Sequence, residues 1–224
     1  MKTKVSVLAS LLFAASVGMV SAASYTLQTG ATATSNGFAN SAGLVYQNSA
    51  SASFAGPGTV GFGIFTISDA QISAAANGGV LTSAFVGFGT TPTGTFTAPG
   101  LSANAGTFSR NSTGTVTGSS FASSLVYLFV GNGTTYANST EFGVFKTTFS
   151  YLAGDDAIPT PIVYTVTNSN TSVLIGSTTS DVKTTGTDAS VTPGFRTAAV
   201  GIPEPSAALL GAIGALGLLR RRRN

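Results

Sequence analysis

Leu125-Val126-Tyr127-Leu128-Phe129-Val130 carries no charge and is apolar or aromatic on both faces of any strand that it forms. Successive side chains of a strand point to opposite faces of a sheet. The run therefore predicts a central strand that is covered on both sides. Gly131-Asn132-Gly133 follows and predicts a tight turn with positive φ angles. The long amphipathic segment from Phe142 to Tyr151 then predicts the next strand.

Other short apolar clusters recur along the chain and are separated by Gly, Pro, Asn and Ser. In Thr59 to Ile67, large apolar residues alternate with Gly61 and Gly63, which predicts a strand with one flat face. The remaining expected strands are Ile162 to Asn168, Val173 to Ile175, and the two arms of a hairpin around Thr91-Pro92, Ala84 to Phe88 and Thr93 to Thr97. Such spacing is typical of all-β domains, and we expect an antiparallel β-sandwich or jelly-roll-like fold.

One short helix is expected among these strands. Ser68 or Asp69 can cap its N-terminus, and Gln71 lies three residues after Ser68, as a capping box requires. Residues 70–76 favour helix, and Asn77-Gly78-Gly79 is expected to end it.

The N-terminus resembles a secretory signal peptide in its order of parts, and we assign residues 1–22 to it. Two lysines, an apolar run and small residues for signal peptidase follow one another: Lys2 and Lys4, Val5 to Val20, and Val20-Ser21-Ala22. Cleavage is therefore expected after Ala22 or Ala23. An N-terminal membrane anchor is the alternative, but the apolar run is shorter than the ~20 residues that span a bilayer.

The C-terminus also has three parts in order: an extended acidic motif, an apolar helix and a basic end, which are Pro203-Glu204-Pro205, residues 206–219 and Arg220-Arg221-Arg222-Arg223. As a helix, residues 206–219 would be about 21 Å long, against a hydrocarbon core of ~30 Å. Snorkelling arginines narrow this gap, so we expect a marginal transmembrane helix that suits a temporary anchor. We expect the arginines to be a cytoplasmic membrane stop. A basic patch for nucleic acid or lipid is the alternative.

Pro203-Glu204-Pro205, the apolar segment and the terminal arginines together resemble the PEP-CTERM sorting signal of Gram-negative bacteria, over residues 202–224. The resemblance implies that secretion machinery and signal peptidase export the chain and that the tail holds it transiently in the inner membrane. It also implies processing near Pro203-Glu204-Pro205 by an exosortase, an integral membrane cysteine protease. Delivery to the cell surface or to an exopolysaccharide-rich extracellular matrix would follow.

Between the two ends, residues 23–192 are expected to form one β-rich extracellular domain, with residues 193–201 as a linker to the tail. Residues 23–201 carry four basic and six acidic side chains, because the other basic residues lie in the terminal segments. Nucleic-acid binding therefore has no electrostatic support. The chain has no Cys and no His, which excludes disulfides, thiolate nucleophiles and the most common general base.

Asp155-Asp156 is the one pair of adjacent carboxylates in the chain. We interpret it as a polar turn between two strands, with a weak Ca²⁺ site or a catalytic dyad as alternatives. We assign no catalytic residue, no metal ligand and no cofactor. Core packing is the default expectation for the aromatic residues on or beside the later strands, Tyr127, Phe129, Tyr136, Phe142, Phe145, Phe149 and Tyr151.

The expected function is a non-catalytic structural or adhesive role in the surface matrix. The strand edges have few charged side chains to prevent pairing with another chain, so self-association is expected there. Exopolysaccharide is a second expected partner. The alternative is an extracellular carbohydrate-binding module, which would need aromatic side chains exposed on one sheet face. A secreted hydrolase ranks third, because it would need two carboxylates that face each other in a cleft.

Overall fold

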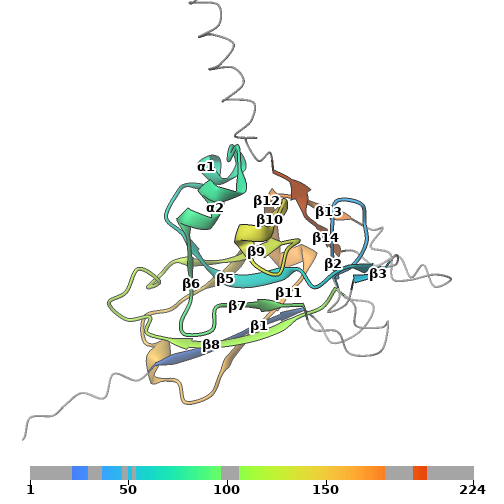
Figure 1. Cartoon of the computed structure of the whole chain (residues 1–224). Helices are drawn as coiled ribbons and strands as arrows, with labels where there is room; N and C mark the ends of the chain where they lie inside the picture. The colour runs from blue at the N-terminus through green and yellow to red at the C-terminus, as the bar shows by residue number, and fades with distance from the viewer. Residues whose placement is uncertain are drawn as a thin grey trace, which may run out of the picture.

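The computed structural model describes residues 22–29, 37–46, 50–51, 54–96, 106–179 and 194–200. In these residues strands predominate, most paired strands are antiparallel, and two short α-helices lie among them (Figure 1). The chain is therefore an all-β protein, as the sequence predicts.

Seven strands form the largest sheet, called here the large sheet: β5 (Thr59–Phe65), β6 (Phe85–Gly87), β7 (Thr93–Thr95), β9 (Leu125–Gly131), β10 (Glu141–Ser150), β12 (Thr171–Ile175) and β15 (Ala198–Ala199). Their order is β12-β10-β9-β5-β6, with β15 beside β10 and β7 beside β5. Three strands form the small sheet, in the order β11 (Ile162–Val166), β1 (Ala23–Thr29) and β8 (Ser109–Gly114).

The remaining elements are short. They are the sheet of β13 (Ser177–Thr179), β14 (Gly194–Arg196) and β2 (Phe38–Ala39), the pair β3 (Ala50–Ser51) and β4 (Phe54–Ala55), helices α1 (Asp69–Ser73) and α2 (Gly78–Ala84), and the 3-10 turns η2 (Tyr136–Asn138), η3 (Asp155–Ala157) and η4 (Asn168–Asn170). Two strand pairs, β1 with β11 and β14 with β2, are parallel rather than antiparallel. Both join segments far apart in the sequence, so no hairpin fixes their direction.

β9 lies between β5 and β10, and both of its faces are buried, as its sequence predicts. Val126, Leu128 and Val130 share one core cluster with residues of β1. Phe129, on the opposite face, belongs to a second cluster with Ile72 of α1. The small sheet and the two helices accordingly cover opposite faces of the large sheet (Figure 1).

The prediction of a tight turn at Gly131-Asn132-Gly133 is wrong. Residues 132–140, which include η2, join β9 to β10, and neither glycine has a positive φ. The side chain of Asn132 closes this longer loop, because its Oδ1 accepts hydrogen bonds from the N–H groups of Thr140 (2.8 Å) and Glu141 (3.1 Å). The amide side chain thus adds to the backbone hydrogen bond from the N–H of Asn132 to the carbonyl of Glu141, at 3.1 Å.

The hairpin predicted between Ala84–Phe88 and Thr93–Thr97 is also wrong. β6 and β7 pair with the two halves of β5 rather than with each other. Residues 88–92 form a loop between β6 and β7. This loop contacts β5 again at Pro92, whose carbonyl accepts a hydrogen bond from the N–H of Phe62 at 3.2 Å. The proline therefore interrupts one edge strand, since it cannot donate to a ladder.

α1 is the predicted helix, and Ser68 and Gln71 form its capping box. The expectation of a single helix is wrong, because α2 begins directly after Asn77. The Oδ1 atom of Asn77 accepts a hydrogen bond from the N–H of Val80 at 3.1 Å, so the residue expected to end one helix caps the next. Burial of Leu81 supplies the packing that two glycines at the start of α2 cannot.

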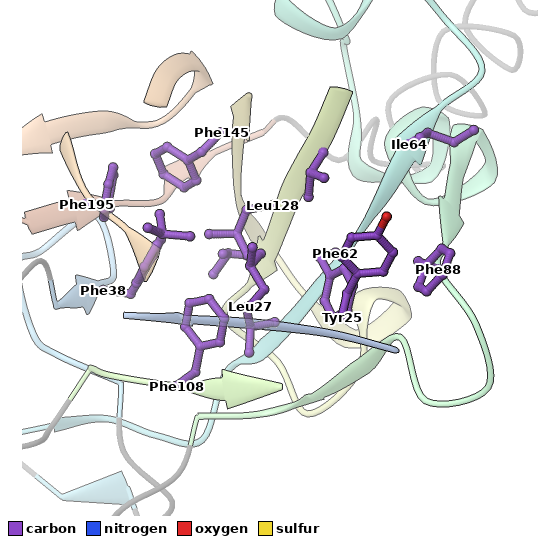
Figure 2. Packing of buried hydrophobic residues seen from close by; sticks show 14 of the residues in the cluster. Tyr25, Leu27, Phe38, Phe62, Ile64, Phe88, Phe108, Leu128, Phe145 and Phe195 are labelled. Atoms are coloured by element: carbon purple, nitrogen blue, oxygen red, sulfur yellow. The ribbon is translucent and has the colours of Figure 1, made fainter. Parts of the chain in front are cut away.

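Aromatic rings fill the space between the two sheets (Figure 2). At one end Phe38 stacks on Phe195, with ring centroids 4.6 Å apart, and Phe145 meets both rings edge-on. At the other end Tyr25 meets Phe88 edge-on at 5.1 Å. Such pairs contribute about 0.5–1.5 kcal/mol each beyond their burial, and they join the short strands β2 and β14 to the core.

Gly61 of β5 makes room for an aromatic side chain on the helix-covered face of the large sheet. In the β5–β9 register, Gly61 lies opposite Phe129 and Gly63 lies opposite Tyr127. Tyr136 stacks on Phe129 with centroids 4.1 Å apart, and a Cβ on Gly61 would lie 2.6 Å from the Tyr136 hydroxyl. The flat face predicted for this strand therefore accommodates a side chain of η2 at Gly61.

Most of the predicted linker, residues 193–201, belongs to the folded domain, which corrects the expected boundary at residue 192. β14 pairs with β13 and β2, and β15 pairs with β10. Phe195 is fully buried and Val200 is also buried. Strands of two or three residues leave no periodicity in the sequence, and for this reason the segment resembles a linker.

Gly63→Ala is expected to lower the free energy of unfolding by about 1–3 kcal/mol, the usual cost of overpacking. The added Cβ would overlap the carbonyl oxygen of Val86, which is backbone and cannot rotate away. Chemical denaturation measures the change. Gly79→Ala is the matched control, because its Cβ would meet only Asn77 Oδ1, at 3.2 Å, and alanine favours helix. Equal losses in the two variants would contradict this explanation.

Candidate functional site

Most of the predicted sorting residues lie outside the described residues. These are Pro203, Glu204, Pro205, the apolar segment 206–219, Arg220, Arg221, Arg222 and Arg223, together with residues 1–21 of the signal peptide. Among the helices that the structure describes, none has the length and apolarity to cross a membrane. Ala22 and Ala23, the residues expected at the signal peptidase site, are both described.

Ala22 and Ala23 differ sharply in environment. Ala22 is exposed, whereas Ala23 is the first residue of β1 and is completely buried. β1 is not among the predicted strands, although Ala23, Tyr25 and Leu27 alternate with polar residues in the period-two pattern of a strand. The strand directly follows the predicted signal peptide, which makes this pattern hard to recognise in the sequence.

The N–H of Ala23 donates to the carboxylate of Asp156, with N and Oδ1 3.2 Å apart. Two more backbone groups donate to the same carboxylate: the N–H of Val116 to Oδ1 at 2.9 Å and the N–H of Thr117 to Oδ2 at 2.7 Å. Asp156 thus ties the start of β1 to the segment that follows β8.

These hydrogen bonds determine the electrostatics of Asp156. Burial by itself would raise the pKa of this carboxyl, but the hydrogen bonds from Thr117, Val116 and Ala23 outweigh burial and hold the pKa below its ordinary value. A lowered pKa means that the carboxylate stabilises the fold above about pH 4. This contribution is lost as the pH falls through the lowered pKa of the folded state.

Asp155 holds the same strand two residues further on. Its Oδ2 accepts hydrogen bonds from the hydroxyl of Tyr25 and, at 3.0 Å, from the N–H of Leu152. Tyr25 is 1% exposed, and its ring meets Phe88 and Tyr151 edge-on, each at 5.1 Å. Burial, together with the Asp155 carboxylate, raises the pKa of Tyr25 far above its ordinary value.

The pair Asp155-Asp156 does lie in a turn between two strands, β10 and β11, as predicted, but the turn is not a solvated one. Both side chains are buried, at 6% and 8% exposed, in η3 just after Gly154, whose φ is +101°. The two carboxylates accept from different donors, and all of these donors belong to the protein. Within the described residues, no three His, Cys, Asp or Glu side chains gather as metal ligands. This arrangement holds β1 in place.

The seven aromatic side chains that the sequence predicts to be in the core are mostly found there. Phe129, Phe142, Phe145 and Tyr151 are buried, and the other three, Tyr127, Tyr136 and Phe149, are partly buried. In the part of the chain that the structure describes, the large hydrophobic side chains that are exposed are aliphatic: Val80, Val86, Leu152, Ile158 and Val163.

A groove of about 460 Å³ lies between α2 and η2. Its lining includes Asn77 and Thr82 from the α2 side and Tyr136 and Ser139 from the η2 side, with Phe142 of β10 between them. The hydroxyl of Tyr136 donates to the carbonyl of Phe129 at 2.8 Å, so it is engaged within the fold. The groove presents mainly backbone and apolar surface, and we assign no ligand to it.

One ion pair fastens α1 to the large sheet. The Nζ of Lys146 lies 2.6 Å from Oδ2 of Asp69, and the hydroxyl of Tyr127 donates to Oδ1 of the same carboxylate at 2.7 Å. The hydrogen bond from Lys146 holds the pKa of Asp69 below its ordinary value. Since both partners are partly exposed, solvent weakens this pair.

No protein-family model, curated protein or solved structure matches this chain. A functional proposal therefore rests on the residues of the chain itself and on their geometry.

Tyr25→Phe is expected to lower the free energy of unfolding by about 1–3 kcal/mol at pH 7, because the Asp155 carboxylate loses its hydroxyl donor. A raised folded-state pKa gives stability below about pH 10 that is lost as the pH rises. The variant should therefore lose less stability than wild type above pH 10. Denaturation series from pH 7 to 11 measure both effects. Tyr127→Phe, which loses a hydroxyl bonded to the more exposed Asp69, is the control with the smaller expected effect. Equal effects would show that burial of Asp155 is unimportant.

Proposed function

We propose that the chain is an exported cell-surface or extracellular-matrix protein with a non-catalytic structural or adhesive role. Residues 202–224 would hold it transiently in the inner membrane until an exosortase cuts near Pro203-Glu204-Pro205. The single observation that carries this proposal is the order of that motif, the uncharged segment 206–219 and the four terminal arginines. The signal peptide over residues 1–22 supplies the export step of the proposal.

The end of the domain supports this arrangement. Pairing of β15 with β10 and burial of Val200 bring the folded domain to within six residues of Ser206, where the apolar segment begins. A chain spans at most about 3.3–3.6 Å per residue, so the tether is at most about 22 Å long. While the tail is in the membrane, the domain would therefore lie next to the bilayer, where an integral membrane protease acts.

The positions of the two ends of the domain fit the same proposal. The start of β1 and the end of β15 lie on opposite sides of the molecule in Figure 1. A domain tethered after Val200 would turn the helix-bearing end toward the membrane and the small sheet outward. We propose that this domain is a β-sandwich of the jelly-roll-like kind, and the core that the large and small sheets share supports the sandwich part of this proposal.

The outer strand β11 is the proposed contact for self-association. The other edge of the small sheet, β8, is covered, because the N–H of Thr90 donates to Thr113 O at 3.1 Å and Arg110 Nη2 donates to Thr93 O at 2.6 Å. In the described residues β11 pairs on one side only, with β1. Val163 on β11 is 53% exposed, and β11 has no charged residue to guard it.

The sorting proposal is tested by expression in a bacterium that has an exosortase, followed by intact-mass analysis and fractionation. Wild type is expected to lose both terminal segments and to reach the cell surface. A variant with Pro203, Glu204 and Pro205 changed to Ala is expected to keep its tail and to stay in the membrane. If both proteins keep the tail, the C-terminus is an ordinary anchor and the exosortase proposal fails.

The adhesion proposal is tested with Val163→Lys, which places a charge on the open edge. We expect purified wild type to self-associate at raised concentration and the variant to do so at least tenfold more weakly, measured by sedimentation velocity. Val80→Lys on α2, a site 42% exposed, is the matched control and should behave as wild type. Equal association of wild type and Val163→Lys would rule out β11 as the contact.

A further inference from the structure

We propose that the exported chain is cut between Ala22 and Ala23 and that the Asp156 carboxylate then holds the new α-ammonium group of Ala23. This inference rests on the export step of the proposed function. The sequence leaves two bonds open to signal peptidase, after Ala22 and after Ala23. The fold distinguishes them.

Only cleavage before Ala23 leaves the domain complete. Ala23 is completely buried, pairs with Gly114 of β8 and donates its N–H to Asp156, whereas Ala22 is exposed and precedes the strand. Cleavage after Ala23 would remove one buried residue and one of the three donors to Asp156. The chain would then begin at Ser24, which pairs with Thr113.

The cut also changes the charge at this position. Hydrolysis consumes one water, breaks the bond between the carbonyl carbon of Ala22 and the nitrogen of Ala23, and leaves a carboxylate on Ala22 and an ammonium group on Ala23. Before the cut, the carboxylate of Asp156 accepts hydrogen bonds from three neutral backbone N–H groups, those of Ala23, Val116 and Thr117. After the cut, one of these donors is a cation at about the same 3.2 Å separation.

A charged donor forms a stronger hydrogen bond with a carboxylate than a neutral one does. The departing Ala22 was exposed, so water reaches the ammonium group from that side and limits its desolvation. Removal of the leader would thus complete an ion pair between the first residue of β1 and η3. Signal peptide cleavage and stability of the domain would be linked through Asp156.

The pH dependence of this ion pair has a definite sign. An α-amino group ordinarily has a pKa of about 7.7–8.0, and a nearby carboxylate raises it. The added stability is therefore present below about pH 7.7 and is lost as the pH rises through the higher folded-state value. The other titratable groups packed around the start of β1 come from four elements or their flanks: Asp155, Tyr25, Tyr151 and Tyr164. None is an amine or a thiol, the groups that ordinarily titrate between pH 7 and 9.

The first test is the intact mass and N-terminal sequence of the protein purified after export. We expect a chain that begins at Ala23. A chain that keeps residues 1–22 would overturn the export proposal itself. A processed chain that begins at Ser24 or elsewhere would overturn this inference and leave export intact.

The second test compares the processed protein with Asp156→Asn and, as the matched control, Asp155→Asn. Wild type and Asp155→Asn are expected to show a fall in denaturation midpoint between pH 7 and 9.5, and Asp156→Asn to lack it. If Asp156→Asn does not accumulate, NMR titration of the wild-type α-amine decides: a pKa above the ordinary value is expected. A midpoint that is flat in wild type, or an α-amine with an ordinary pKa, would overturn the ion pair.

Discussion

Burial of β9 on both faces constrains every other element of the domain. A strand that is apolar on both sides needs two covers, and here they are the small sheet on one face and α1 with α2 on the other. The glycines of β5 are needed because a Cβ on Gly61 would meet the Tyr136 hydroxyl and a Cβ on Gly63 would meet the backbone of β6. The short strands β2 and β14 are held by ring stacking rather than by long ladders. With few charges available, the fold depends on packing and on hydrogen bonds from Ser, Thr, Asn and backbone.

Sequence patterns predict the parts of this fold whose signals are local. The central strand at Leu125–Val130, the long strand beginning at Phe142 and the capping box of Ser68 and Gln71 each follow from residues near one another. Pairing partners were not predictable in the same way, because β6 and β7 share β5 through long-range contacts. β15 at Ala198–Ala199 is too short to show a period, although it ends the domain.

The candidate sites differ in the same way: one can be recognised from local sequence, and the other only from the structure. The order of Pro203-Glu204-Pro205, an apolar run and arginines is a linear pattern, so the sequence suffices to propose sorting. Burial of Asp155 and Asp156 is a three-dimensional property, since their donors come from β1, from the segment after β8 and from the loop before η3. Adjacent carboxylates ordinarily indicate a solvated turn; here they hold the first residues of the domain. The folded region thus begins at Ala23, where the proposed signal peptide ends, and closes at Val200, just before the proposed sorting tail.

The central claim is that the two proposed targeting segments flank a single folded unit with these two boundaries. Limited proteolysis of the full-length chain, followed by intact-mass analysis, tests it most directly. The account predicts a resistant core that retains Ala23 at one end and Val200 at the other, because Ala23 is buried and paired with Gly114, and Val200 is buried directly after the paired strand β15. A resistant core that begins beyond Thr29 or ends before Gly194 would contradict it.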